Sequence, residues 1–322
     1  MVRRSLNAMS VAHGGVEVQM ARAAGLLSDL TNQRLDTVTV RSLDQKDAPF
    51  LALVVSKLSP ILGNLLERHI ASMLSNDLMT NDTASRYRWV RQDPEFPDAL
   101  LVATDGTSTR AGYEVKAWYP LSTEVTGRFR ESLNLLAGRD VRLTIVSWMM
   151  DRIVYGTPVI LDVLLIDARS VAEARDAHYH NPPDYLIVEP RDTSARTRNL
   201  QQTNVNGYKL QEASAARRAE AEAAVATSRA RTAPPHSQEA QALASDLMAR
   251  FAYRLDTNFA KLDRIDHPTI ESFKRAVHNT NIYGRTVLDW SKVLRAAEDD
   301  SKPQAKAAAE RAIAELYAAS TI

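Results

Sequence analysis

The sequence predicts a protein of mixed α and β structure (α/β or α+β), with a mixed central sheet flanked by helices and a helical C-terminal part. Two observations predict this class. Through the middle of the chain, short apolar runs suited to strands alternate with segments of helical periodicity. From about residue 238 onward, helical periodicity is almost continuous.

Composition predicts a division of the chain near residues 210–236. The 322 residues are enough for one large domain or two modest ones. Residues 212–232 are alanine-rich and charged, and the sequence at 233–237 is typical of a linker. We therefore expect an α/β domain with N-terminal helices over 1–210, a charged helix and linker over 211–236, and a helical region over 237–322.

Two segments before the predicted sheet have helical periodicity, residues 16–34 and residues 49–79. In the second, Pro60 suits a first helical turn after Ser59 as a cap. The residues that follow form one apolar face: Ile61, Leu62, Leu65, Leu66, Ile70, Met73 and Leu74. Glu67 falls at the polar edge of that face.

A predicted hairpin over residues 97–118 brings acidic and basic side chains together. Asp98 opens one apolar run, and an Asp-Gly pair at 105–106 supplies the turn. Glu114 and Lys116 lie two positions apart in the second run, hence on one face of a strand. Two carboxylates and a lysine at one end of a hairpin suit a hard divalent cation, and phosphodiester hydrolysis is the chemistry that most needs such a site.

The acid–x–lysine spacing alone is weak evidence, because it also occurs at residues 44/46 and 300/302. Only Glu114 and Lys116 lie in an apolar β-like run that follows a Pro-Asp pair through one turn. The alternative for them is a solvated strand face with a marginal ion pair. The alternative for Glu67 is an ordinary glutamate at a helix edge.

The remaining elements are predicted from periodicity and from breaking residues. Strands are expected at 141–149, 159–167 and 185–188. Helices are expected at 123–136, 170–178, 238–263, 269–278, 285–297 and 303–319.

The Pro-Asp pair at 97–98, followed by Glu-Val-Lys at 114–116, resembles the motif of the PD-(D/E)xK nuclease superfamily. Glu67 is similar to the additional acidic residue that many restriction endonucleases of this superfamily carry. The resemblance covers about residues 60–136. It implies a nuclease domain with a restriction-endonuclease-like fold over residues 1–210.

The resemblance also implies a role for each residue of the motif. Asp98 and Glu114, with the backbone carbonyl of Val115, would bind Mg²⁺, for which Mn²⁺ could substitute. Lys116 would orient the attacking water and stabilise developing negative charge. Glu67 would orient Lys116 or contribute to a second metal position.

Side chains suited to nucleic acid gather in residues 191–211. Between 191 and 232 there are eight Lys and Arg against four Asp and Glu. Candidate contacts to bases and phosphates are Arg196, Arg198, Asn199, Gln201, Gln202, Asn204, Asn206 and Lys209. Arg128 and Arg130, on the helix predicted at 123–136, are candidate phosphate contacts. The alternatives are a polar loop rich in turn-forming residues and a solvated helix face.

Global composition limits the remaining options. The net charge is only +1, so attraction to nucleic acid must come from local patches. The chain has no cysteine, which excludes thiolate chemistry and agrees with a reducing cytoplasm. No apolar run of membrane-spanning length is present, and the N-terminus lacks an apolar signal core, although its arginines leave an organellar presequence as an alternative.

The expected function is a Mg²⁺-dependent, type II-like restriction endonuclease that acts as a homodimer on double-stranded DNA. The helical region 237–322 is expected to serve dimerisation or DNA contact. One alternative is a DNA repair or structure-specific nuclease of the same fold. A second is a non-catalytic DNA-binding or assembly protein with a nuclease-like fold. A third, which rests only on the C-terminal third of the chain, is a helical scaffold with no role on nucleic acid.

Overall fold

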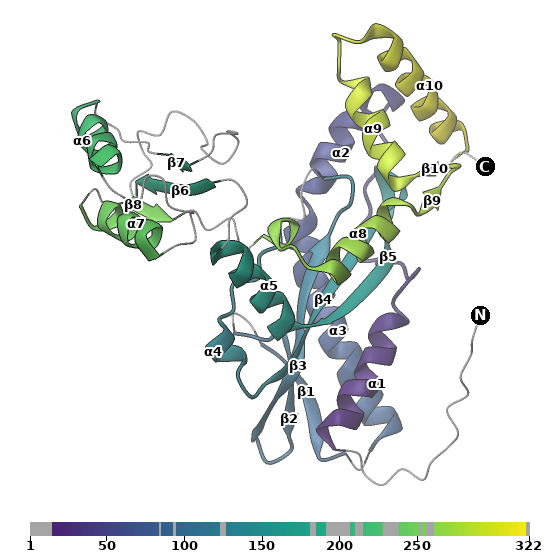
Figure 1. The fold of residues 1–322 in the computed structure, drawn as a ribbon. Helices are drawn as coiled ribbons and strands as arrows, with labels where there is room; N and C mark the ends of the chain where they lie inside the picture. Colours follow the sequence, from purple (N-terminus) through teal and green to yellow (C-terminus); the bar gives the residue numbers. More distant parts are fainter. Residues whose placement is uncertain are drawn as a thin grey trace. The chain divides into compact units, whose positions relative to one another are not determined.

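A computed structural model of the protein describes residues 15–83, 85–92, 95–122, 127–180, 185–190, 207–209, 215–227, 238–250, 253–255 and 261–319. They form a mixed α/β protein, as predicted (Figure 1). The chain divides into two compact units. Unit 1 comprises Met1–Gly127, Glu131–Ser170 and Pro268–Ile322, and unit 2 comprises Arg128–Arg130 and Val171–His267.

Unit 1 contains a five-stranded mixed sheet in the order β1-β2-β3-β4-β5. The β1–β2, β2–β3 and β4–β5 pairs are antiparallel, whereas β3 and β4 are parallel. The strand predictions at 141–149 and 159–167 are confirmed by β4 and β5. The strands are β1 Tyr87–Arg91, β2 Ala99–Ala103, β3 Ser108–Trp118, β4 Asp140–Arg152 and β5 Tyr155–Asp167.

The predicted hairpin is present as β2 and β3. Gly106 has φ of 90° in its turn, a backbone angle that glycine adopts without strain, and the Asp105 carboxylate accepts a hydrogen bond of 2.8 Å from Thr107 N–H. The pairing register shifts between Leu101 and Val102. Beyond this irregularity the pairing is regular as far as Ala99 opposite Tyr113, which sets Asp98 beside Glu114.

The helices of unit 1 come from both ends of the chain. The segment predicted to be helical over 49–79 is two helices bent by 54°, with Leu58 rather than Ser59 as the cap of the second. The helix predicted over 16–34 ends earlier, at Ser28. The helices are α1 Val16–Ser28, α2 Ala48–Ser56, α3 Ser59–Asn81, α8 Pro268–His278, α9 Val287–Ala297 and α10 Pro303–Ala319.

The core of unit 1 lies between these helices and the sheet. Helix α3 packs on β1, β2 and β3, and it buries Leu62, Leu66, Ile70 and Leu74 as its periodicity predicts. Ile61 differs from the prediction, because it is exposed. Within the described parts of the chain, no single helix has the length and apolar character needed to cross a membrane, and only the bent pair Gln45–Ser56 and Ser59–Asn81 passes that test when taken together.

The C-terminal helices do not form a separate region as predicted for 237–322. Trp290 of α9 and Ile313 of α10 belong to the same hydrophobic core as Leu27 of α1 and Leu66 of α3. Phe273 of α8 packs on Trp118 of β3, with ring centroids 5.9 Å apart. The apolar faces of these amphipathic helices are therefore covered by their own chain, so 268–322 folds with unit 1.

Between residues 123 and 263 the structure differs from the predicted secondary structure at two places. Among the described residues of the helix expected over 123–136, only α4 of unit 1, Leu133–Leu136, is helical. Residues 128–130 are not helical, because Arg128 forms an isolated antiparallel bridge with Lys261 and the Phe129 carbonyl accepts a hydrogen bond of 3.1 Å from Arg175. The helix expected over 238–263 stops at Arg250, and strand β8 follows.

The other predicted elements of this region are present. Helix α5 and strand β6 confirm the predictions for 170–178 and 185–188, and β6 joins β7 and β8 in a second sheet. The predicted linker at 233–237 lies outside the described residues. The elements are α5 Ala168–His180, β6 Tyr185–Pro190, β7 Gly207–Lys209, α6 Ala215–Thr227, α7 Gln238–Arg250 and β8 Tyr253–Leu255.

We expect Gly112→Ala to destabilise the protein by about 1–3 kcal/mol, because an added methyl overpacks the hairpin. A Cβ at Gly112 would lie 2.4 Å from the Ala99 carbonyl oxygen and 2.6 Å from Cγ of Pro97. Urea unfolding measures the change. The control is Gly25→Ala in α1, where no atom lies within 4 Å and we expect the opposite sign, about 0.5–1 kcal/mol of stabilisation. Equal effects at both positions would contradict the close approach.

Candidate active site

Two hydrogen bonds join Asp98 to the Glu114–Val115 segment at one end of the β2–β3 hairpin. The backbone N–H of Val115 donates to Oδ2 of Asp98 at 2.7 Å. The backbone N–H of Asp98 donates to Oε2 of Glu114 at 3.3 Å. Each carboxylate is therefore held by an amide of the opposite strand segment.

Lys116 completes this cluster. Its ammonium donates to Oε1 of Glu114 and, at 3.1 Å, to the backbone carbonyl of Val115. The same nitrogen lies 3.9 Å from Oδ2 of Asp98. The Lys116 side chain is only 20% exposed and that of Glu114 only 11%. Three oxygen groups thus surround one positive charge in a site largely closed to water.

Burial and the neighbouring charges shift the pKa of both Glu114 and Lys116. Burial raises the pKa of Glu114 from 4.5 to about 7, where the Lys116 ammonium lowers it and the Asp98 carboxylate raises it. For Lys116, burial favours the neutral form, but the carboxylates of Glu114 and Asp98 outweigh burial and raise its pKa. Lys116 is therefore a protonated donor at neutral pH.

Glu67, which lies on α3, is close enough to the cluster for its charge to interact with Asp98 and Lys116. Its pKa is raised by burial and by the Asp98 carboxylate, while Arg91 and Lys116 lower it. Its carboxylate accepts a hydrogen bond of 3.2 Å from Nη2 of Arg91. The structure thus brings Glu67 near Asp98 and Lys116, as the sequence predicts, but couples it to a residue that the sequence analysis did not identify.

Arg91 is that additional residue, and a signal for it exists in the sequence. Arg91 is two positions after Trp89 on β1, so both side chains leave the same face of the strand. Trp89 is buried, and its backbone carbonyl accepts a hydrogen bond of 3.1 Å from Ser75 of α3. An arginine one strand period beyond a buried aromatic is thereby directed toward the helix that carries Glu67.

The oxygen groups around Lys116 are of the kind that bind hard cations. The carboxylates of Asp98 and Glu114 and the carbonyl of Val115 already converge on one cationic nitrogen. Among the residues that the structure describes, no three His, Cys, Asp or Glu side chains are grouped as a metal site. A cation could be held by the two carboxylates, the carbonyl and solvent only after the Lys116 ammonium had moved aside.

The candidate DNA contacts lie elsewhere or outside the described residues. Arg128 and Arg130 are exposed, but they belong to unit 2 and not to a helix. The side chain of Lys209, at the end of β7, is not described. Outside the described residues lie Arg196, Arg198, Asn199, Gln201, Gln202, Asn204 and Asn206.

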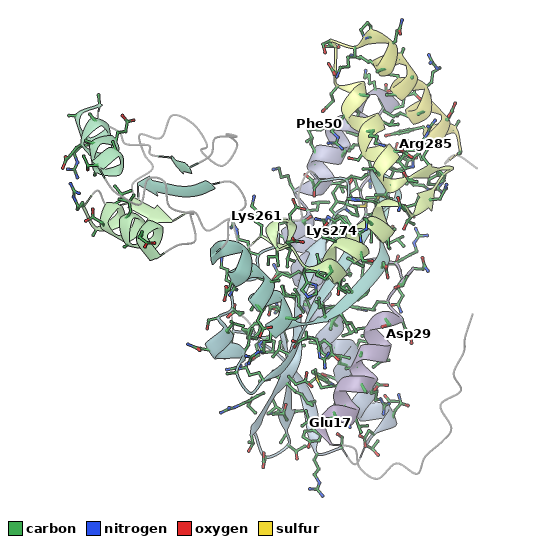
Figure 2. The ribbon with its side chains drawn as sticks, viewed as in Figure 1. Glu17, Asp29, Phe50, Lys261, Lys274 and Arg285 are labelled. Atoms are coloured by element: carbon green, nitrogen blue, oxygen red, sulfur yellow. The ribbon has the colours of Figure 1, made fainter. Side chains whose placement is uncertain are left out.

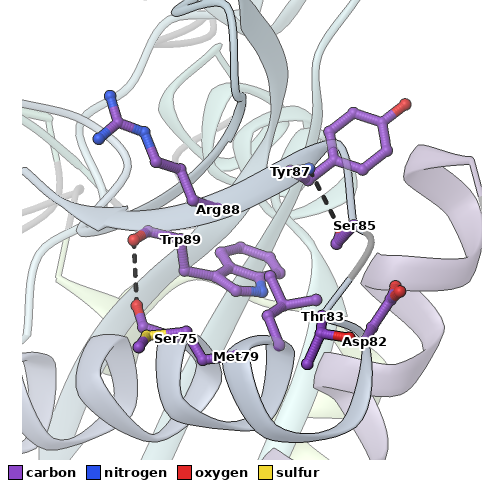
Figure 3. A pocket seen from close by; sticks show the side chains of 9 residues that line it. Ser75, Met79, Asp82, Thr83, Ser85, Tyr87, Arg88 and Trp89 are labelled. Carbon is purple, nitrogen blue, oxygen red and sulfur yellow. Dashed lines mark hydrogen bonds between the residues drawn. The ribbon is translucent and has the colours of Figure 1, made fainter.

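A pocket of about 460 Å³ lies between the end of α3 and the start of β1 (Figure 3). Trp89 points into it, and Asp82 at its edge accepts a hydrogen bond of 2.8 Å from the side chain of Gln19 on α1. The lining residues are Ser75, Leu78, Met79, Asp82, Thr83, Ser85, Tyr87, Arg88 and Trp89. None of the site residues predicted from the sequence belongs to this lining.

Comparison with known proteins does not place the chain in a family. No protein-family model, no curated protein and no solved structure matches it. The class that the fold and the site define is a mixed α/β protein whose hairpin carries a buried cluster of two acids and a lysine.

We expect the stability of the native protein relative to Glu114→Gln to fall as the pH rises from about 4.5 to about 7 in metal-free buffer. The folded state binds the Glu114 proton more tightly than the unfolded state, so this stabilisation is complete below pH 4.5 and is lost as the pH passes about 7. Urea unfolding at each pH measures the difference. Glu222→Gln, at an exposed position of α6, gives the baseline. A difference that stays constant with pH would contradict the assignment.

Proposed function

We propose that the protein is a Mg²⁺-dependent endonuclease that hydrolyses phosphodiester bonds of double-stranded DNA at a short specific site, similar to type II restriction enzymes. The observation that carries this proposal is the convergence of Asp98, Glu114 and the Val115 carbonyl on the ammonium of Lys116. The mixed sheet flanked by helices supports a restriction-endonuclease-like fold, which is part of the proposal.

In this proposal, Asp98, Glu114 and the carbonyl of Val115 hold the divalent ion, Mg²⁺ or Mn²⁺. When bound, the ion supplies positive charge that polarises the phosphoryl group and makes a bound water more acidic. The amides of Val115 and Asp98 would keep the two carboxylates in place, so that the Lys116 ammonium is the group that has to move.

Lys116 acts as a hydrogen-bond donor rather than as a base. In the metal-free protein its pKa is raised by the carboxylates of Glu114 and Asp98 despite burial, so it is protonated at neutral pH. It would orient the attacking water and stabilise the negative charge that develops on the phosphoryl oxygens. Glu67, oriented by Arg91, adds negative charge near Lys116 and keeps its ammonium directed toward the site.

The partners follow from this chemistry and belong to the same proposal. The substrate is double-stranded DNA, and base readout is assigned to residues 191–211. Cleavage of both strands at a two-fold site calls for a homodimer. We further propose that the enzyme works in the cytoplasm, as the absence of cysteine first suggested.

We expect Lys116→Ala to lower the rate of plasmid cleavage with Mg²⁺ by at least about 10²–10³-fold while DNA binding persists, because one preorganised donor is lost. Gel electrophoresis of supercoiled plasmid measures cleavage, and gel shift in Ca²⁺ measures binding. Lys292→Ala, an exposed lysine of α9, is the matched control. Full cleavage by Lys116→Ala would refute the assignment.

The same assay separates the alternatives. Defined bands indicate a site-specific enzyme, whereas cleavage confined to ends or branches indicates a repair or structure-specific nuclease of the same fold. Salt-dependent DNA binding without cleavage indicates a non-catalytic DNA-binding protein, and the absence of both indicates a scaffold.

We expect calorimetry to show Mn²⁺ binding by the native protein and by Lys116→Ala, but not by Asp98→Asn. Asp98 supplies a charged oxygen ligand, whereas Lys116 competes with the ion for the same oxygens. A titration at pH 8 keeps Glu114 ionised in the native protein, because its pKa is about 7. Persistence of binding in Asp98→Asn would show that the ion is held elsewhere.

A further inference from the structure

Helix α2 exposes an apolar face that the described residues of the chain do not cover. Leu51 and Val55 of this helix are buried in the core. On the other side, Phe50 is 58% exposed, Leu53 55% and Val54 37% (Figure 2). Three large apolar side chains within one helical turn form a contiguous patch, and such patches mark interaction surfaces.

The helix itself carries no charge, but the positions that flank it do. No residue of Ala48–Ser56 is charged. Asp47 is the N-cap position and Lys57 the C-cap position. Residues 47, 50, 54 and 57 are spaced so that they lie along one face of the helix. The face formed by the half-buried Asp47 and the exposed Phe50, Leu53, Val54 and Lys57, which we call the α2 face, is therefore acidic at one end, apolar in the middle and basic at the other.

We propose that the α2 face binds the α2 face of a second copy of the chain in antiparallel orientation. Around a two-fold axis, Asp47 of each copy lies opposite Lys57 of its mate, and the apolar centres meet. A parallel arrangement would instead bring like charges together at both ends. The face is thus complementary in charge to itself, which selects a second copy over a polyanion or a charged protein.

The location of the interface differs from the one predicted from the sequence. The helical region 237–322 was the expected dimerisation element, but the apolar faces of α8, α9 and α10 are buried within unit 1. Helix α2 keeps Phe50 and Leu53 more than half exposed; α3 also has two such side chains, Ile61 and Met79, but they lie at its opposite ends. This inference deepens the proposed function. It rests on that function in one respect: two copies would supply one active site for each DNA strand.

The interface is small, and its strength can be bounded. A nine-residue helix is about 14 Å long, so one helix pair lies at the low end of protein interfaces. We therefore expect a dissociation constant on the order of micromolar. Sedimentation velocity of the full chain across a dilution series that brackets this value measures it without DNA or metal.

The test uses one apolar substitution and a charge exchange. We expect Leu53→Glu to raise the dimer dissociation constant by at least about tenfold, since the change occurs twice in the interface. Asp47→Lys and Lys57→Asp should each weaken the dimer by a similar factor, and the double variant should restore it. Glu222→Lys on α6 is the control and should leave the dimer unchanged. Circular dichroism verifies that each variant is folded.

Each outcome decides between the interface and its rivals. Rescue by the double charge exchange supports the antiparallel α2 pair, because no other contact would respond to both changes together. A monomer at every concentration, or a dimer that Leu53→Glu leaves intact, overturns the proposal. The measurement is independent of cleavage: a dimeric but inactive protein overturns the nuclease proposal alone, and an active monomer overturns the α2 interface alone.

Discussion

The two reciprocal hydrogen bonds between Asp98 and the 114–115 segment are the constraint on which the site depends. They tie the start of β2 to the middle of β3 at 2.7 and 3.3 Å, and they orient both carboxylates toward the same point. The two strand segments approach closely enough for these bonds because residue 112 is glycine; a side chain there would collide with Pro97 and with the Ala99 carbonyl. The geometry of the hairpin therefore determines where the two carboxylates lie.

A buried cluster of acids needs a compensating cation. Burial raises the pKa of Glu114 and of Glu67, and the Asp98 carboxylate raises both further. Lys116 offsets this for the first acid and Arg91 for the second. Both cations are themselves partly buried, so each pair depends on close contact rather than on solvent. Two carboxylates and a carbonyl that surround one positive charge favour cations over anions. The nuclease proposal depends on this preference.

The sequence was most informative where local rules decide the structure. The Asp-Gly turn and the two-residue period of β3 were enough to place Glu114 and Lys116 together, and the apolar spacing of α3 identified most of its buried face. Tertiary partners decided the rest. The backbone of 128–130 bonds to Lys261 and Arg175, which local propensity cannot show. Nor could it show that 268–322 returns to unit 1, or that Arg91 reaches Glu67. In α2 almost every residue is apolar, so periodicity could not distinguish its exposed face from its buried one.

The most direct measurement of the central claim is anomalous X-ray diffraction from crystals grown with Mn²⁺. We expect one strong peak bonded to Asp98, Glu114 and the carbonyl oxygen of Val115, with the Lys116 ammonium displaced from its present contacts with those oxygens. A crystal in which Lys116 keeps these contacts and the Mn²⁺ peak lies elsewhere would contradict the account. In that case the hairpin cluster would be an ion pair that stabilises the fold, and the protein would need another site for any chemistry on DNA.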